Sequence, residues 1–207
     1  MKNMKIGLFF GSFNPIHIGH LAIANYIVEF TDLDKVWFVV SPHNPLKQKN
    51  TLLADHHRLE MVRLAVEDDN RFKASDIEFK LSQPSYTIDT LAYLREKYPD
   101  TNFAVIMGSD GLSSFEKWKN FRELINNYPR YVYPRPGTNP ELLKNIENGR
   151  VVNAPLMDIS STFVRESIAN KKDLRYFLPE KVWQYISDMH FYESKSSAPK
   201  TENRDLV

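Results

Sequence analysis

The stretch that decides the fold reads Gly11-Ser12-Phe13-Asn14-Pro15-Ile16-His17-Ile18-Gly19-His20. It follows an apolar run at residues 6–10 and leads into residues 21–28, whose apolar character is typical of a buried helix. The order of strand, tight loop and helix is where an α/β sheet places a phosphate site. His17 and His20 share one side of the first helical turn, and Gly19 between them lets a ligand approach the backbone closely. We therefore predict that this loop binds a nucleotide triphosphate.

The composition predicts one globular domain of balanced charge. The chain has 207 residues, of which 42% are hydrophobic, and this is enough for one domain with a proper core. Its 27 Lys and Arg residues nearly match its 26 Asp and Glu residues, giving a net charge of +1. A dedicated nucleic-acid-binding protein would show a strong basic excess, so we expect no nucleic-acid partner. The absence of cysteine excludes disulfides, thiolate metal sites and cysteine nucleophiles.

The sequence also predicts where the protein acts. No apolar run approaches the roughly 18 residues that are needed to span a membrane. The N-terminal residues lead directly into the first predicted strand and lack the apolar region and cleavage site of a signal peptide. We therefore expect a cytoplasmic protein with no membrane partner.

Strands and helices alternate along the chain. We predict strands at residues 5–10, 35–40, 72–74, 77–79, 102–107, 131–133 and 151–152, and helices near residues 19–30, 54–67, 87–98, 115–126, 141–148, 160–170 and 179–190. Thr87 and either Ser161 or Thr162 are the predicted N-caps of their helices. This order predicts an α/β fold with a doubly wound, mainly parallel Rossmann-like sheet, helices on both faces and a small helical C-terminal part. We expect a single domain over residues 1–193 and a disordered tail at 194–207.

Several loops leave the predicted strands at the same end of the sheet, where open α/β sheets bind their ligands. They span residues 11–20, 42–47, 108–110 and 133–136, and residues 160–165 open a late helix. The loops carry cationic side chains that could bind phosphates, namely His17, His20, His43, Lys47, Arg135 and Arg165. Asp110 could hold a ribose or a metal.

Each of these features also has a simpler explanation. The two histidines could cap the helix or bind zinc, but His56-His57 is the only other cluster and lacks the glutamate spacing of a hydrolytic zinc site, so no protein metal site is predicted. Residues 160–162 could be an ordinary N-cap, although Arg165 one turn later adds a cation to a helix start that favours anions. Lys47 could be solvated and Trp118 could be a core residue. Tyr86 and Thr87 could be mere cap residues, or their helix start could receive a carboxylate.

The motifs together resemble a known family. Residues 11–20 resemble the G-x-F-x-P-x-H-x-G-H loop of the nucleotidyltransferases with an H-x-G-H motif, and residues 159–165 match their late I-S-S-T-x-x-R motif. Residues 42–47, 84–91, 108–110 and Trp118 are similar to the bacterial nicotinate-nucleotide adenylyltransferases, and the resemblance covers residues 5–190. Two departures stand out: Phe10-Gly11-Ser12 replaces the usual Gly-Gly-Thr/Ser, and Asn44-Pro45-Leu46 separates His43 from Lys47.

The resemblance implies the transfer of AMP from ATP to nicotinate mononucleotide, in NAD biosynthesis. The products are nicotinate adenine dinucleotide and pyrophosphate, and magnesium accompanies the ATP. It implies catalytic roles for His17, His20 and Arg165. It implies ATP binding by Gly11, Ser12, Phe13, His17, Gly19, His20, His43, Lys47, Gly108, Asp110, Ser160, Ser161, Thr162 and Arg165. It implies binding of nicotinate mononucleotide by Ser12, Phe13, Lys47, Tyr86, Thr87, Trp118 and Arg135.

The chemistry implied by this resemblance needs no protein base. The second pKa of a phosphate monoester is near 6, so the attacking phosphate is largely dianionic at pH 7. Catalysis then reduces to alignment and charge stabilisation. The alternatives are an adenylyltransferase for nicotinamide mononucleotide or phosphopantetheine, a non-catalytic nucleotide sensor, and a tRNA synthetase relative. No oligomeric state is predicted.

Overall fold

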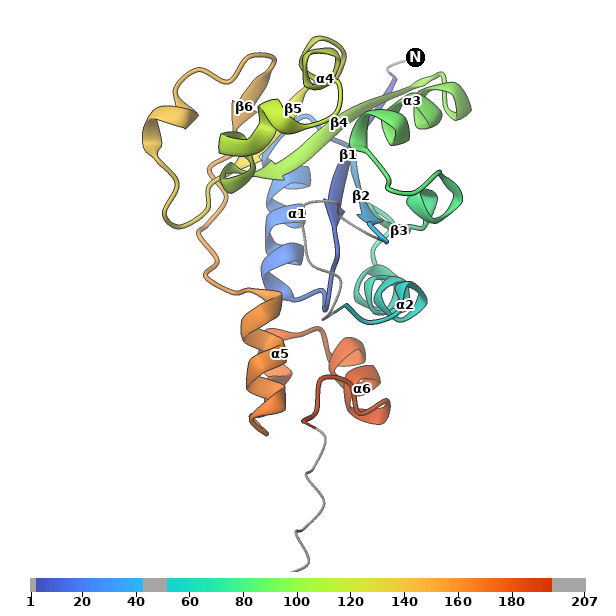
Figure 1. Cartoon of the computed structure of the whole chain (residues 1–207), viewed down its shortest axis with the longest axis vertical. Coiled ribbons are helices and arrows are strands. Elements are labelled where there is room, and N and C mark those ends of the chain that lie inside the picture. Colours follow the sequence, from blue (N-terminus) through green and yellow to red (C-terminus); the bar gives the residue numbers. More distant parts are fainter. Residues whose placement is uncertain (1–2, 43–51, 195–207) are drawn as a thin grey trace, which may run out of the picture.

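The computed structural model describes residues 3–42 and 52–194 (Figure 1). Its strands are β1 (Met4–Gly11), β2 (Lys35–Val40), β3 (Phe72–Ser75), β4 (Thr101–Gly108), β5 (Arg130–Tyr133) and β6 (Gly149–Val151). Its α-helices are α1 (Ile18–Phe30), α2 (Asp55–Val66), α3 (Thr87–Lys97), α4 (Phe121–Asn127), α5 (Ser161–Ala169) and α6 (Glu180–Asp188). Short 3-10 helices are η1 (Ile77–Lys80), η2 (Ser109–Lys117), η3 (Pro140–Leu143) and η4 (Arg175–Phe177).

The strands form one parallel sheet in the order β3-β2-β1-β4-β5-β6. Gly11 at the end of β1 pairs in register with Val40, and Gly108 at the end of β4 pairs with Tyr133. The carboxyl ends of the central strands therefore meet at one edge. The strand order reverses between β1 and β4, which is the point where this architecture opens a ligand crevice. The predicted doubly wound parallel sheet is confirmed.

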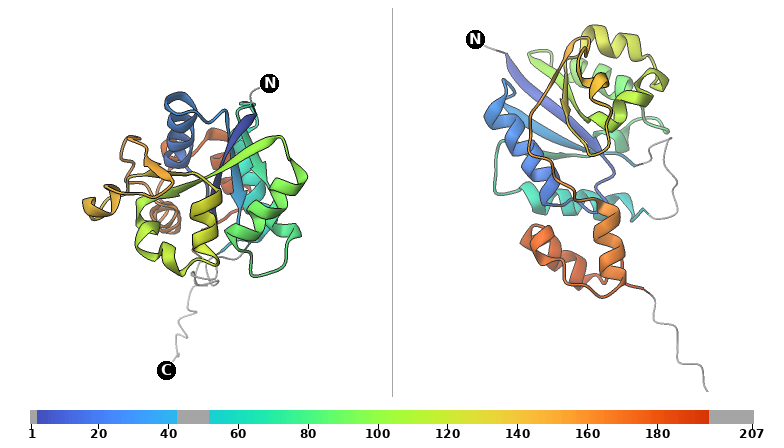
Figure 2. Two further views of the ribbon diagram at one scale, coloured as in Figure 1. Left: turned by 90° about the horizontal axis from the view of Figure 1, so that it is seen from above. Right: turned by 90° about the vertical axis from the view of Figure 1, so that its left-hand side faces the viewer.

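Helices cover both faces of the sheet (Figure 2). On one face, Phe9 and Phe38 pack with α1, α2 and the C-terminal helices. On the other face, Leu8 and Trp37 pack with α3 and α4. Because both faces are covered, β2 is a continuous buried run from residue 36 to residue 40 rather than an alternating one.

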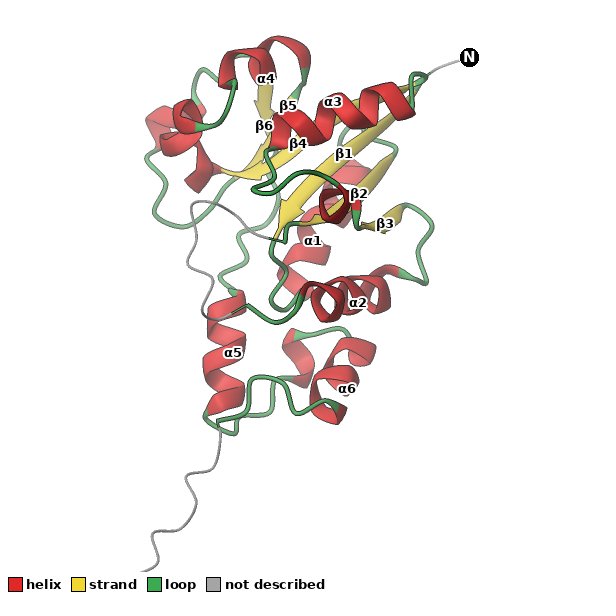
Figure 3. Cartoon of the chain, turned by 45° about the vertical axis from the view of Figure 1, so that its right-hand side comes forward, coloured by secondary structure: helices red, strands yellow, loops and turns green. Residues whose placement is uncertain are grey.

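The small C-terminal part lies beyond the carboxyl ends of the strands. Figure 3 shows α5 and α6 past the end toward which β1 points. The Lys181 ammonium of α6 contacts the carboxylates of Glu67 and Asp68 just after α2. The Tyr185 hydroxyl lies 2.8 Å from the His57 ring nitrogen of α2. The predicted helical C-terminal part is confirmed, and its position places α5 beside the opening loop.

Several predicted local details are wrong. Residues 77–79 form η1 and not a strand, because Ile77 and its neighbour Glu78 are both buried and the alternation of a half-buried strand is broken. The helix predicted over 115–126 is divided between η2 and α4, with Asn120 in the left-handed region at φ 50°. The predicted helix 141–148 is replaced by the short 3-10 helix η3 at residues 140–143, which overlaps only its start. The single domain over 1–193 stays a prediction, and the predicted tail lies outside the described residues from 195 onward.

The observed N-caps lie one position earlier than predicted. Tyr86, not Thr87, is the N-cap of α3. Ser160, not Ser161 or Thr162, is the N-cap of α5, and its hydroxyl accepts the Phe163 N–H at 3.1 Å. None of the described helices is long and apolar enough to cross a membrane.

A fully buried arginine joins α2 to the loops at the sheet edge. Arg58 has no exposed side-chain surface, and all five of its N–H groups donate hydrogen bonds. The acceptors are the carbonyl oxygens of Ser12 (2.6 Å), Ser41 (2.9 Å), Leu53 (3.0 Å) and Pro42 (3.4 Å), and the carboxylate of Asp55 (2.6 Å). Backbone carbonyls in loops lack ladder partners, so one guanidinium replaces the partners that a strand or helix would provide.

Replacing Arg58 with methionine should lower the free energy of unfolding by about 3 kcal/mol, because several loop carbonyls lose their donors at once. Urea denaturation measures the change. Arg63→Met on the same helix is the matched control, since the Arg63 side chain is 56% exposed and makes only an ion pair with Glu60. The control should change stability by no more than about 0.5 kcal/mol. Equal effects of the two substitutions would contradict this role of Arg58.

Candidate active site

The opening loop turns back on itself between β1 and α1. Phe13 has a positive φ of 44° and is 2% exposed, with its ring centroid 5.1 Å from that of His20 and 5.6 Å from that of Phe38. Its side chain is therefore a core residue, and a contact with ligand would come from its backbone. Ser12 is half-buried, and its carbonyl is held by Arg58.

The two histidines of the loop lie against each other at the start of α1. Their ring centroids are 3.8 Å apart, and the His17 backbone N–H donates to Nδ1 of His20 at 3.3 Å. Because Nδ1 of His20 accepts this bond, neutral His20 carries its proton on Nε2. Gly19 is buried beneath this pair, and a Cβ there would lie 3.1 Å from Nδ1 of His17. Gly19 thus makes room for the His17 ring.

His17 is a buried, neutral histidine. It is 4% exposed, and burial, assisted by the positive charge of Arg135, lowers its pKa to about 4. Its Nδ1 is buried and has no hydrogen-bond partner among the described residues. A buried polar atom without a partner is costly, so this nitrogen is suited to a polar ligand group. Arg135 is therefore close enough to His17 for its charge to lower the pKa of the imidazole.

The start of α5 docks on the opening loop. The Ser161 hydroxyl donates to the Pro15 carbonyl at 2.8 Å, and Nη1 of Arg165 donates to the Asn14 carbonyl at 2.9 Å. Nη2 of Arg165 contacts the Thr162 hydroxyl at 3.2 Å. The structure therefore joins two motifs that lie about 150 positions apart in sequence. A helix N-terminus and a guanidinium together favour an anion at this place.

Asn14 connects the loop to the end of the described chain. Its side-chain oxygen accepts the Leu53 N–H at 3.3 Å and the Tyr192 hydroxyl at 2.8 Å. Burial raises the pKa of Tyr192 far above its ordinary value, so its hydroxyl keeps its proton and acts as a donor. No local sequence pattern relates Tyr192 to a loop 178 positions earlier, so this contact could not be predicted.

The loops after β4 and β5 bring an acid and a base together. Nε of Arg135 lies 3.9 Å from the Asp110 carboxylate, and both side chains are partly exposed. Gly108 permits this arrangement, because a Cβ there would lie 2.3 Å from the Asp110 carboxylate oxygen. Tyr133 beneath them is buried, which raises its pKa to about 12. No group of three or more metal-ligating side chains exists among the residues that the structure describes.

Two of the residues predicted to bind the acceptor lie at the start of α3, and a third, Trp118, lies in a segment that contacts it through Lys119. Tyr86 is the N-cap and Thr87 the first helical residue. Trp118 is half-buried, with its ring centroid 5.1 Å from that of Phe115. The next residue, Lys119, lies over the Tyr86 ring at 4.7 Å and binds the Asp89 carboxylate at 2.8 Å. Lys119 thus connects the Trp118 segment to the start of α3, a role that no sequence motif indicates.

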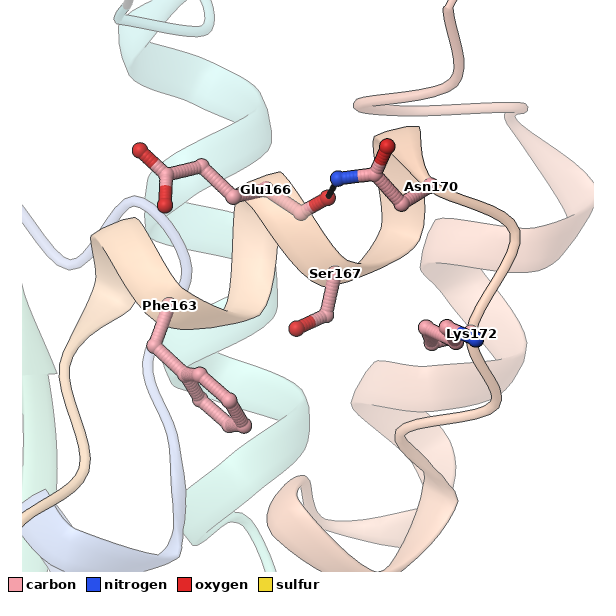
Figure 4. Close-up of a pocket in the computed structure, with 5 residues that line it drawn as sticks. All are labelled: Phe163, Glu166, Ser167, Asn170 and Lys172. Atoms are coloured by element: carbon pink, nitrogen blue, oxygen red, sulfur yellow. Dashed lines mark hydrogen bonds between the residues drawn. The ribbon is translucent and has the colours of Figure 1, made fainter.

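Two of the residues predicted to bind phosphate lie outside the described part of the chain. His43 and Lys47 belong to residues 43–51, which the structure does not describe. A shallow hollow beside α5 is lined by Phe163, Glu166, Ser167, Asn170 and Lys172 (Figure 4). It contains none of the predicted site residues, and its polar groups are partly used within the helix, since Asn170 donates to the Glu166 carbonyl.

Comparison with known proteins identifies the family. The cytidylyltransferase-like family profile matches residues 8–167. A relative from Flavobacterium psychrophilum is 54% identical over 192 residues, which cover 92% of this chain and 100% of that protein. A relative from Bacteroides thetaiotaomicron is 48% identical over 187 residues, covering 90% of this chain and 93% of that protein. Both are named probable nicotinate-nucleotide adenylyltransferase. The chain belongs to the bacterial nicotinate-nucleotide adenylyltransferase family.

Solved structures agree with this family in fold. A Plasmodium falciparum nicotinic acid mononucleotide adenylyltransferase, determined in complex with NaAD, superposes with a TM-score of 0.76. The match covers 91% of this chain and 97% of that one at 20% identity, so it shows the nucleotidyltransferase fold. The resemblance found in the sequence is therefore confirmed for the family and for the fold.

The low pKa of His17 predicts a pH dependence of stability. The unfolded chain binds this proton near pH 6.5, but the folded chain binds it only near pH 4, so acid favours unfolding in that window. Between pH 7 and pH 5, His17 should lower the free energy of unfolding by about 2 kcal/mol. Urea denaturation at both pH values measures the difference, and His17→Asn should remove this part of it.

The matched control for this titration is His56→Asn, at an exposed position of α2. It should leave in place the part of the difference between pH 7 and pH 5 that His17 contributes. If His17→Asn and the unmodified chain lose the same stability in acid, His17 is not the buried neutral group described above.

Proposed function

We propose that this chain transfers AMP from ATP to nicotinate mononucleotide, forming nicotinate adenine dinucleotide and pyrophosphate. The observation that carries the proposal is the docking of Ser161 and Arg165 on the loop that holds His17 and His20. This docking gathers neutral donors and a cation around one crevice at the β1–β4 switch point. Membership of the adenylyltransferase family supports the same reaction.

In the proposed reaction, a phosphate oxygen of the mononucleotide attacks the α-phosphorus of ATP. The bond from that phosphorus to the bridging oxygen breaks, and pyrophosphate leaves with the electron pair. The attacking phosphate is mostly a dianion at pH 7, so no side chain has to remove a proton. The site then needs donors that align the phosphates and stabilise developing charge. Neutral His17 and His20 suit that role, because each can present an N–H without adding a buried charge.

The other predicted residues divide between the two substrates. We assign the leaving pyrophosphate to Arg165 and to the start of α5, where Ser160, Ser161 and Thr162 lie, together with Ser12. We assign the rest of ATP to Asp110 and the backbone at Gly11, Phe13, Gly19 and Gly108. Arg135, with Ser12 and Phe13, would hold the phosphate of the mononucleotide. His43 and Lys47 stay predicted phosphate ligands.

The nicotinate end would lie at the start of α3. Trp118 would stack on the pyridine ring, while the helix start at Tyr86 and Thr87 would receive the carboxylate. ATP is expected as its magnesium complex, in which the ion neutralises phosphate charge. The Asp110 carboxylate is an oxygen ligand of the type that magnesium prefers, although most of its ligands would come from ATP and water. A cytoplasmic location stays a prediction.

Replacing His20 with alanine should lower kcat for nicotinate adenine dinucleotide formation by about 10²–10³, because one donor to the phosphates is lost. Coupled detection of pyrophosphate measures the rate. The control is His56→Ala, which should retain the turnover of the unmodified chain. A near-normal rate for the His20 variant would contradict its role, and no pyrophosphate from the unmodified chain would indicate a nucleotide sensor.

Nicotinamide mononucleotide should be the poorer acceptor. Its amide carries no charge, so it gains less from the helix start at Tyr86 and Thr87. Comparing kcat/KM for the two mononucleotides tests this expectation. Equal values would mean that the acceptor carboxylate is not recognised at this helix start.

A further inference from the structure

A buried acid, Glu78, lies under the start of α3. It belongs to η1 and is 2% exposed. One carboxylate oxygen accepts the Ser85 hydroxyl at 3.0 Å, and the other accepts the Thr90 hydroxyl at 3.0 Å. Both hydroxyl residues are buried themselves, Ser85 at 8% exposure and Thr90 at 0%. Within residues 3–42 and 52–194, no basic side chain forms an ion pair with Glu78.

The two hydroxyl groups lie on either side of the N-cap. Ser85 precedes Tyr86, and Thr90 lies one turn into α3, where its hydroxyl also contacts the Tyr86 carbonyl at 3.3 Å. Gln83 adds a third link, since its amide donates to the backbone carbonyl of Glu78 at 3.0 Å. One carboxylate therefore holds the helix start from both sides.

Holding a helix start with a buried carboxylate that has no cationic partner costs desolvation free energy. Burial raises the pKa of Glu78, and the surrounding hydroxyl groups only partly oppose that shift. An apolar side chain of similar size would fill the same space at less cost. Hydrogen bonds are directional, however, so this anchor fixes the orientation of the helix start as well as its position.

We infer that Glu78 is a positioning residue for acceptor recognition. It orients the first turn of α3 so that the N–H groups after Tyr86 point at the carboxylate of nicotinate mononucleotide. The inference rests on the proposed function, in which that helix start receives the acceptor carboxylate. Glu78 is too deeply buried to touch the substrate, so it acts through Ser85 and Thr90.

The decisive variant is Glu78→Gln, which keeps the size and changes the hydrogen bonding. The amide NH₂ must donate where the carboxylate accepted, so one of the two hydroxyl groups has to turn away from its present direction. We expect KM for nicotinate mononucleotide to rise about tenfold while KM for ATP stays within about twofold. The preference for nicotinate over nicotinamide mononucleotide, as a ratio of kcat/KM values, should fall by a similar factor.

Two further variants guard against a failure to fold. Ser85→Ala and Thr90→Val each remove one hydroxyl group and should each reduce the nicotinate preference in the same direction.

Asp32→Asn is the matched control, because Asp32 is also a hydrogen-bonded acid. It accepts from Lys5 and from the Tyr131 hydroxyl at 2.7 Å, near the amino-terminal ends of β1 and β5. This control should leave both KM values and the nicotinate preference unchanged.

The outcomes separate this inference from the proposed function. If the unmodified chain forms no nicotinate adenine dinucleotide, the proposed function is wrong and the inference falls with it. If the unmodified chain is active but the Glu78, Ser85 and Thr90 variants lose only thermal stability, the inference alone is overturned. Equal increases in KM for ATP and for the mononucleotide would also overturn it.

Discussion

Three backbone carbonyls of the opening loop are held by donors from distant parts of the chain. Arg58 of α2 binds the Ser12 carbonyl, while Arg165 and Ser161 of α5 bind those of Asn14 and Pro15. A loop that leaves a strand and doubles back has no ladder or helix to satisfy these groups. The donors must therefore come from other elements, here α2 and α5, and these elements become part of the site. This requirement explains why a small C-terminal helical part lies at the carboxyl edge of the sheet.

The same requirement determines the charges around the crevice. All N–H groups of the Arg58 guanidinium donate to oxygens of the protein, so its charge holds the loop and does not face a ligand. Arg165 and Arg135 are partly exposed and keep donors near the crevice. His17 beside them is neutral because burial and Arg135 both lower its pKa. The site thus combines partly exposed arginines with a buried neutral histidine, which suits a reaction that redistributes phosphate charge without proton transfer to the protein.

The sequence predicts much of the framework but less of what supports it. Long apolar runs identify the central strands, and the spacing of His17 and His20 predicts their shared side of α1. Arg58 could not be recognised, because an arginine three positions after Asp55 is typical of an exposed helix pair. Glu78 was placed in a predicted strand, where an acid is expected to face solvent. Tyr192 lies between the last predicted helix and the polar tail, where no local pattern predicts a contact. In each case the missing information is a partner that only the folded chain supplies.

The Arg58 and Glu78 side chains both lie close to Ser41, which follows β2, and this residue connects the two halves of the site. The Ser41 carbonyl accepts a hydrogen bond from Arg58, which holds the loop assigned to ATP. The Ser41 side chain also lies near Glu78, where it helps to keep down the pKa of the acid that holds the helix start assigned to the acceptor. Ser41 is in turn fixed to β1, since its N–H donates to the Gly11 carbonyl at 2.9 Å. Two substrates that react in line must be held at a constant distance and angle. Ser41 accepts a bond from Arg58, donates one to the central strand and lies near Glu78, so it favours that constancy by linking the two halves of the site.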